Sequence, residues 1–416
     1  MRIVLENIKE LVQVEDSSVK LKAGDEMSEL RVLNNAYIVM RDGLIEGLGL
    51  MKDLDREKLD NDVLMELDCT GKLVFPSYCD SHTHLSFPRE MVGEFARQVS
   101  KENFDACNFM HEGILSLSRI TGKCSEKDLY NVMFSRLSEI ASLGTGAIEI
   151  KSGYGLTVDS ELKILRAIKR LKQDSPLVIK STFLGAHTMP ERYKNDRQKY
   201  VEILVHEMIP QISAEGLADF IDIACGSRFF SLIETEQILM AGIKYELRPK
   251  IHVCDPNGGD AILACIKYNA LSADFMENFV GGEIDSLQGT ETMPTLTPGS
   301  AFFFKQRTIP ARRMIDAGLP VALASDYNPF SFPSGNMNIV QSLGCINYQV
   351  TPEEAINAVT LNSAYAMGVE GICGSLCEGK IANMFITKEI GGYASIPYNF
   401  GNNLIETVIL DGKIIK

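Results

Sequence analysis

Residues 74–85 read VFPSYCDSHTHL, and the prediction of the fold works outward from this stretch. An apolar run typical of a β-strand ends there in Asp80, which is followed by His82 and His84. Because side chains alternate between the two faces of a strand, the two imidazoles point the same way. Neutral histidine is the commonest metal ligand, so the pair suggests a metal site. The alternative is a solvated strand end with two incidental histidines, and further ligands at other strand ends would decide between the two.

From residue 74 to about residue 366, short apolar runs alternate with helical segments, which is typical of βα units around a parallel sheet. Strands are predicted at residues 74–84, 147–154, 178–187, 220–225, 250–255, 271–276, 292–297 and 321–326. This pattern favours the α/β class and a (β/α)8 TIM-like barrel. Two long segments, residues 86–125 and 327–350, are expected to be loops over one mouth of the barrel, where active sites of this architecture lie.

Both ends of the chain carry shorter β-like runs that are separated by turns. Runs at residues 35–40, 44–48 and 63–67 near the beginning have counterparts at residues 382–387 and 407–410 near the end. We therefore expect residues 1–73 and 367–416 to form one small β-sandwich domain. Residues 74–366 would form the barrel domain.

The composition limits the class of protein. The chain has 416 residues, of which 45% are hydrophobic, so it can bury a large core. Its net charge of −14 argues against a nucleic-acid partner, because phosphate binding needs a basic surface. Apolar runs are too short to span a membrane, and Glu6, Lys9 and Glu10 lie where a signal peptide would be apolar. Ten cysteines at irregular spacings fit reduced thiols, so we expect a cytoplasmic protein.

The predicted strand ends carry further ligand types. In a barrel, the carboxyl ends of the strands converge on one pocket. His252 lies in the run 250–255 and Asp326 ends the run 321–326. With His82 and His84, they make a credible site for one divalent ion, Zn²⁺ or Fe²⁺, with a position open for water. Taken singly, His252 could be a core histidine and Asp326 a helix cap, but the four residues together favour a metal.

Several motifs resemble those of a known family. They are the His82-Thr-His84 pair, KSGYGL at residues 151–156, TFLGAH at residues 182–187 and SDYNP at residues 325–329. In this order they resemble the amidohydrolase superfamily and, within it, the imidazolonepropionases, as a divergent member. The resemblance implies a cytoplasmic, homodimeric hydrolase that uses one metal ion to open a cyclic amide. Its substrate would be 4-imidazolone-5-propanoate, which is converted to N-formimino-L-glutamate in histidine degradation.

The resemblance also implies roles for single residues. Four would be metal ligands: His82, His84, His252 and Asp326. Four would bind the substrate or its carboxylate tail: Arg89, Tyr154, His187 and Asn328. Asp326 would also accept a proton from the attacking water, and Asp255 would act as a proton shuttle. Simpler interpretations stay open, because Arg89 could be a solvated residue, Tyr154 could cap a turn and His187 could be structural.

Four positions depart from the family pattern. Asp255 replaces a Glu and is one methylene shorter. Phe275 replaces a His that would polarise the scissile carbonyl, and such a donor commonly contributes about a hundredfold in rate. Gly226 replaces a Glu, and Phe330 replaces a Gly where it would narrow the pocket. Two hypotheses therefore stay open: an amidohydrolase acting on imidazolonepropanoate or on a related cyclic amide or amidine, and a metal-binding barrel that has lost catalysis.

Overall fold

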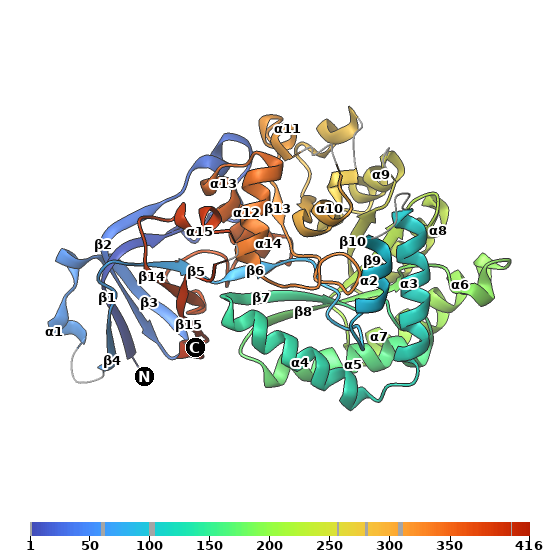
Figure 1. Ribbon diagram of the computed structural model, residues 1–416, viewed down its shortest axis with the longest axis horizontal. Coiled ribbons are helices and arrows are strands. Elements are labelled where there is room, and N and C mark those ends of the chain that lie inside the picture. Colours follow the sequence, from blue (N-terminus) through green and yellow to red (C-terminus); the bar gives the residue numbers. More distant parts are fainter. Residues whose placement is uncertain are drawn as a thin grey trace.

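The computed structural model describes residues 2–59, 63–99, 105–255, 258–278, 282–306, 311–400 and 402–416. Two separate sheets organise these residues, a parallel barrel and a mixed sheet (Figure 1). The helices pack around the barrel, while both termini lie at the mixed sheet (Figure 1). None of the described helices is both long and apolar enough to cross a membrane.

The barrel contains eight parallel strands, each paired with the next one along the chain. They are β6 (Tyr78–Asp80), β7 (Thr145–Lys151), β8 (Val178–Ala186), β9 (Phe220–Cys225), β10 (Arg248–Val253), β11 (Ser272–Asp274), β12 (Met293–Leu296) and β13 (Ala322–Leu323). A parallel bridge between Thr83 and Tyr327 joins the segments that follow the first and last strands. Beside it, the backbone N–H of Asp326 donates to the carbonyl of His82 at 3.0 Å. The prediction of a (β/α)8 barrel is confirmed.

The helices between and after the barrel strands cover the outside of the barrel (Figure 1). They are α4 (Glu126–Ser142), α5 (Val158–Asp174), α6 (Arg197–Ile203), α7 (Ile209–Ala214), α8 (Leu232–Lys244), α9 (Gly259–Lys267), α10 (Pro298–Phe303), α11 (Ala311–Asp316), α13 (Pro352–Val359) and α14 (Leu361–Tyr365). The start of α13 follows from its sequence, because the hydroxyl of Thr351 accepts from the N–H of Glu354 and the Glu354 carboxylate accepts from the N–H of Thr351. Pro352 takes the first helical position, where no N–H is needed.

The expectation of two long loops was wrong. Residues 86–125 contain α2 (Val92–Val99) and α3 (Ala106–Thr121), and residues 327–350 contain α12 (Met337–Tyr348). The physical reason is burial: Ile114 and Leu117 of α3 lie in the main core, on the same side of the helix. Residues 100–104 of the expected loop lie outside the described part of the chain.

The mixed sheet combines both ends of the chain. Its strands are β1 (Arg2–Val12), β2 (Val32–Arg41), β3 (Leu44–Leu50), β4 (Val63–Asp68), β5 (Lys72–Pro76), β14 (Met384–Glu389), β15 (Ile405–Leu410) and β16 (Lys413–Ile414). Strand β5 lies between β1 and β14 and so joins the two ends of the chain. The run 74–84, which we predicted as one barrel strand, is therefore split, since β5 belongs to the mixed sheet and β6 to the barrel. The break follows Pro76, which has no N–H to extend a ladder.

Short helical turns complete the described elements. They are η1 (Gly24–Ser28), η2 (Met51–Asp53), α1 (Arg56–Leu59), η4 (Glu191–Tyr193), η5 (Leu204–Met208), η6 (Met276–Asn278), η7 (Gly282–Leu287) and α15 (Ser395–Tyr398). The side chains of nine cysteines are described, and all nine are free thiols, as the spacing predicted. The proposed domain boundaries at residues 73/74 and 366/367 stay predictions.

Candidate metal centre

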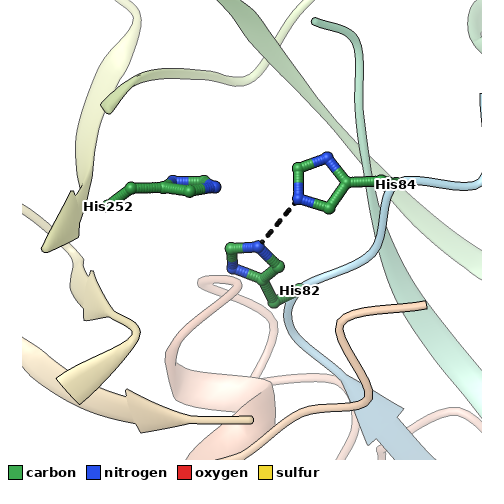
Figure 2. A group of neighbouring side chains, drawn as sticks. All are labelled: His82, His84 and His252. Atoms are coloured by element: carbon green, nitrogen blue, oxygen red, sulfur yellow. Dashed lines mark hydrogen bonds between the residues drawn. The ribbon is translucent and has the colours of Figure 1, made fainter. Parts of the chain in front are cut away.

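Three buried histidines meet at the carboxyl ends of the barrel strands. His82 and His84 follow β6, His252 lies on β10, and their rings point toward one another (Figure 2). One nitrogen of each ring lies within 4.8 Å of the others. The Nε2 atoms of His82 and His84 are 3.1 Å apart. Imidazole nitrogens gathered in this way can hold a divalent metal ion.

The contacts of His82 fix which of its nitrogens faces this cluster. Its Nδ1 lies 2.6 Å from Oδ2 of Asp274. Burial would raise the pKa of Asp274, but Lys250 and Lys151 hold it well below its ordinary value, so the carboxylate is ionised and Nδ1–H donates to it. Nε2 then carries no proton, and its lone pair faces Nε2 of His84. Burial and the nearby Lys151 lower the pKa of His82 to about 3, which keeps the ring neutral, as metal ligation requires.

The other two histidines share this environment. Burial and the neighbouring histidines hold the pKa of His84 well below its ordinary value. Nδ1 of His252 lies 2.9 Å from Oδ2 of Asp222. A carboxylate beside the outer nitrogen of a ligating histidine is the usual way in which such a ring is oriented. The side chains around the cluster therefore fit a metal ion.

Asp326 lies where the segments that follow β13 and β6 meet. Its Oδ1 lies 3.5 Å from Nε2 of His84 and 3.8 Å from Nε2 of His82. Its Oδ2 accepts hydrogen bonds from Oγ of Ser300 at 2.5 Å and from Nδ2 of Asn328 at 2.9 Å. Burial raises the pKa of Asp326 well above its ordinary value. One oxygen is thus held in place while the other faces the histidines, which suits a fourth ligand or a proton acceptor.

A network of five buried charged side chains supports the histidines. Its members are Glu149, Lys151, Asp222, Lys250 and Asp274, which come from β7, β9, β10 and β11. Nζ of Lys151 lies 2.7 Å from Asp222 and 3.4 Å from Asp274, and it also donates to Glu149. Burial alone would lower the pKa of Lys151, but these three carboxylates raise it overall, so the ammonium stays charged. Asp222 and Asp274 therefore already share a cation with Glu149.

A pocket of about 250 Å³ opens beside the histidines. Its polar lining includes His84, His187, His252, Glu277 and Asp326. Its apolar lining includes Met110, Ile114, Phe229, Phe275 and Phe304. Its size and its few convergent polar groups suit a small organic substrate.

Two of the predicted substrate-binding residues lie beside the cluster. The ring of His187 stacks on that of His84, with centroids 5.1 Å apart, and its Nδ1 lies 3.1 Å from the carbonyl of Gly153. The ring of Tyr154 lies 5.7 Å from that of His187, and its buried hydroxyl has no hydrogen-bond partner among the described residues. The carboxylate of Glu161 accepts three backbone N–H groups of this loop, from Gly153, Gly155 and Leu156. The KSGYGL motif therefore owes its shape to Glu161.

The side chains of three other predicted residues do not line the pocket beside the histidines. Arg89 is exposed and pairs with Glu94 at 3.0 Å. The amide of Asn328 is occupied by Asp326 and by the N–H of Phe330 and Ser331, so it holds Asp326 instead of facing the pocket. Asp255 lines a separate pocket and accepts hydrogen bonds from the N–H and hydroxyl of Ser227 at 2.6 and 3.0 Å.

The departures from the family pattern have different structural effects. The ring of Phe275 lies 5.0 Å from the rings of both His82 and His252, so an apolar group takes the place beside two candidate ligands. Gly226 lies against Asp255, where an added Cβ would come within 3.0 Å of its carboxylate. The expectation for Phe330 was wrong, because its side chain is buried against Gly113 and does not line the pocket.

Sequence reasoning missed Glu277. This residue lies in the turn η6, only three positions after Asp274, and lines the pocket. Its Oε1 accepts a hydrogen bond from the hydroxyl of Tyr348 at 2.7 Å and another from the N–H of Thr297. Burial raises the pKa of Glu277 to about 7, although these hydrogen bonds oppose the shift. No motif marks it, and the only signal in the sequence is a Glu just beyond a predicted strand end.

Comparison with known proteins shows the family of this chain. A sequence model of the amidohydrolase family matches residues 265–415. The imidazolonepropionase of Flavobacterium johnsoniae is 45% identical over 415 residues, covering 100% of both chains. The chain belongs to the imidazolonepropionase family. Another imidazolonepropionase, from Geobacillus kaustophilus, is 36% identical over 410 residues and covers 98% of this chain and 96% of its own.

Solved structures resemble this imidazolonepropionase-family chain at lower identity. A triazine hydrolase variant superposes with a TM-score of 0.75 at 16% identity, covering 100% of this chain and 94% of its own. Guanine deaminase from C. acetobutylicum superposes with a TM-score of 0.72 at 14% identity, covering 100% of both chains. At these identities, the likeness shows the fold.

Proposed function

We propose that this protein hydrolyses 4-imidazolone-5-propanoate to N-formimino-L-glutamate in histidine degradation. The observation that carries the proposal is the convergence of three histidines and Asp326 on one pocket at the carboxyl end of the barrel. Membership of the imidazolonepropionase family supports the choice of substrate. A hydrolase of the amidohydrolase family acts on a C–N bond, as this ring opening requires.

The proposed cofactor is one divalent ion, zinc or iron, held by His82, His84, His252 and Asp326. When bound, such an ion polarises a carbonyl and lowers the pKa of water. The donor set fits it because His82 is neutral and directs Nε2 toward the cluster. Both metals accept imidazole and carboxylate ligands, so the donor set supports either one.

Asp326 is the proposed proton acceptor. Ser300 and Asn328 hold its Oδ2, which leaves Oδ1 to take a proton from the attacking water. A buried carboxyl with a raised pKa is a stronger base than an exposed one, which suits this task. We assign the proton transfer to Asp326 ahead of Asp255, because Asp255 would first have to break its two hydrogen bonds with Ser227.

The substrate would be held by His187, Tyr154 and Arg89. If Nδ1–H of His187 donates to the carbonyl of Gly153, its Nε2 is available to accept from a ring N–H. The ring of Tyr154 lies next to it, and its hydroxyl has no hydrogen-bond partner in the described part of the chain. Arg89 would turn from Glu94 to the carboxylate tail, and an exposed ion pair of this kind is worth only about 0–1 kcal/mol.

A second candidate is a related cyclic amide or amidine. Phe275 favours this candidate. The family's polar residue at this position would contact the substrate, whereas this chain places an apolar ring there, beside His82 and His252. Complete loss of catalysis is the third outcome. We also infer a small-molecule partner, a cytoplasmic homodimer and no role for membranes or nucleic acid.

The test is steady-state hydrolysis of freshly generated 4-imidazolone-5-propanoate by metal-replete protein. Loss of the ring's ultraviolet absorbance is followed against the spontaneous background, with Asp326→Asn as the matched inactive control. Turnover well above that control supports the proposal. Turnover equal to the control, with metal bound to the wild type, would overturn it and direct the search to other cyclic amides.

A further inference from the structure

Glu277 offers the pocket a carboxylate that the reaction scheme above does not use. The side chain is only 5% exposed and lines the same pocket as His84, His187 and Asp326. A carboxyl group buried at this level normally satisfies both of its oxygens within the protein. Among the described residues, Glu277 finds hydrogen-bond partners for only one of them.

The two oxygens of Glu277 have different surroundings. Oε1 accepts hydrogen bonds from the hydroxyl of Tyr348 and the backbone N–H of Thr297. Oε2 is buried and has no hydrogen-bond partner among the described residues. Because a buried polar atom without a partner is costly, the free oxygen points to a group that arrives with the ligand.

Other polar groups that could serve the same purpose are absent from this position or directed elsewhere. Phe275, two residues earlier, presents an apolar ring to His82 and His252. The carboxylate of Asp255 is bound to Ser227 in a separate pocket. Glu277 is thus a carboxylate of the pocket lining that holds one oxygen available and stands apart from the four proposed metal ligands.

We propose that Oε2 of Glu277 accepts a hydrogen bond from a ring N–H of the substrate and thereby selects rings that carry such a group. This inference rests on the proposed function for the identity of the ring. An ionised carboxylate forms a strong, charge-assisted hydrogen bond with N–H, and the two donors on Oε1 fix the direction of Oε2. Glu277 is therefore a specificity residue that contacts the ring.

Glu277→Gln separates this role from a structural one. The backbone N–H of Thr297 can only donate, so the amide oxygen of the variant must take the place of Oε1. The amide NH₂ then takes the place of Oε2 and presents donors where the wild type presents an acceptor. The anchoring contacts are kept, but the polarity toward the ring is reversed.

The experiment measures binding of imidazole-4-propanoate and of its two N-methyl isomers at pH 8 by calorimetry. The ring N–H is present in the first probe and absent from both isomers, because a neutral N-methylimidazole has no ring N–H. Wild type should prefer the unmethylated ring to both isomers by about 10- to 100-fold, and Glu277→Gln should lose most of this preference. Glu202→Gln, at a partly exposed site on the surface, serves as the matched control and should keep it.

A merely structural role would weaken binding of all three probes alike, so an unchanged preference in Glu277→Gln would overturn the inference. Thermal unfolding checks that the variant folds. If Glu277→Gln does not fold, Glu277→Asp is measured instead. Its carboxylate is one methylene shorter, and it too should lose most of the preference for the unmethylated ring. Because the probes are not turned over, the result stands whether or not the wild type hydrolyses imidazolonepropanoate, and the two proposals can fail separately.

Discussion

Nδ1 of His82 and Oδ2 of Asp274 lie 2.6 Å apart, which connects a candidate metal ligand directly to the buried charge network of the barrel. The network of Glu149, Lys151, Asp222, Lys250 and Asp274 keeps Asp274 ionised, and Asp274 in turn fixes the tautomer of His82. The charges inside the barrel thus keep Nε2 of His82, which faces the histidine cluster, without a proton.

Removing this carboxylate should weaken metal binding without removing a ligand. We expect Asp274→Asn to lower metal affinity by about 10- to 100-fold, because the amide does not hold His82 as an ionised acceptor does. Competition with a chromophoric chelator measures the affinity. Asp196→Asn, on the surface, is the control, and equal affinities in the two variants would contradict the proposed role of Asp274.

Removing a proposed ligand should have a larger effect. His82→Ala and Asp326→Asn should each reduce bound metal sharply and abolish activity, because each takes away a donor that the other residues cannot replace. Elemental analysis of the purified variants gives the stoichiometry. Full metal occupancy in both variants would show that the ligand set is wrong.

The charge network should be sensitive to loss of a single member. Lys250→Met removes one of the ammonium groups that pair with the buried carboxylate of Glu149. Because this leaves a buried charge less well compensated, we expect the free energy of unfolding to fall by about 3–5 kcal/mol. Urea denaturation measures it. Arg166→Met, which breaks an exposed pair with Glu215, should cost about 1 kcal/mol or less, and equal losses would argue against a buried network.

Glu277 should make stability depend on pH. Its pKa is about 7 in the folded protein against an ordinary value of 4.5, so between these values the native state keeps a proton that the unfolded state releases. Its contribution is full below pH 4.5 and is lost as the pH rises through 7. We expect the unfolding free energy of wild type, relative to Glu277→Gln, to fall by about 3 kcal/mol across this window. Urea denaturation from pH 4.5 to 8 measures the difference, and parallel profiles would contradict the raised pKa.

Arg89 gives a kinetic prediction. If it turns to the carboxylate tail, Arg89→Met should raise KM far more than it lowers kcat, because a tail contact stabilises the bound substrate and the transition state alike. Steady-state kinetics with imidazolonepropanoate tests this. Wild-type kinetics in the variant would mean that Arg89 keeps its contact with Glu94 and that another residue binds the tail.

The barrel strands could be predicted because short apolar runs between helical patterns are a local signal. The predicted strand at residues 220–225 coincides with β9, and the prediction at residues 178–187 extends one residue beyond β8. The run 74–84 was harder, because β5 and β6 follow each other within one strand-like run and nothing local shows that they belong to different sheets. The pairing of β5 with β14 depends on strands from opposite ends of the chain.

The residues of the site also differ in how well the sequence could predict their positions. His82 and His84 could be placed together because two residues of one strand-like segment share a face. The sequence could not show which of Asp255 and Glu277 faces the pocket. Each lies beyond a strand end, where the turn decides the direction of the side chain. Phe275 has φ +62 and redirects the chain before Glu277, while Asp255 is held by Ser227. Neither backbone conformation follows from residue type.

The bridge between Thr83 and Tyr327 has a consequence for the order of folding. The segments it joins carry His82, His84 and Asp326, and they lie near opposite ends of the barrel sequence. During synthesis, which releases the amino-terminal part first, the histidines emerge long before their carboxylate partner. The proposed ligand set can therefore assemble only after the last strand has been made and the segments that follow the first and last strands have come together. A metal ion that binds all four residues would accordingly favour the completed barrel over any shorter nascent chain.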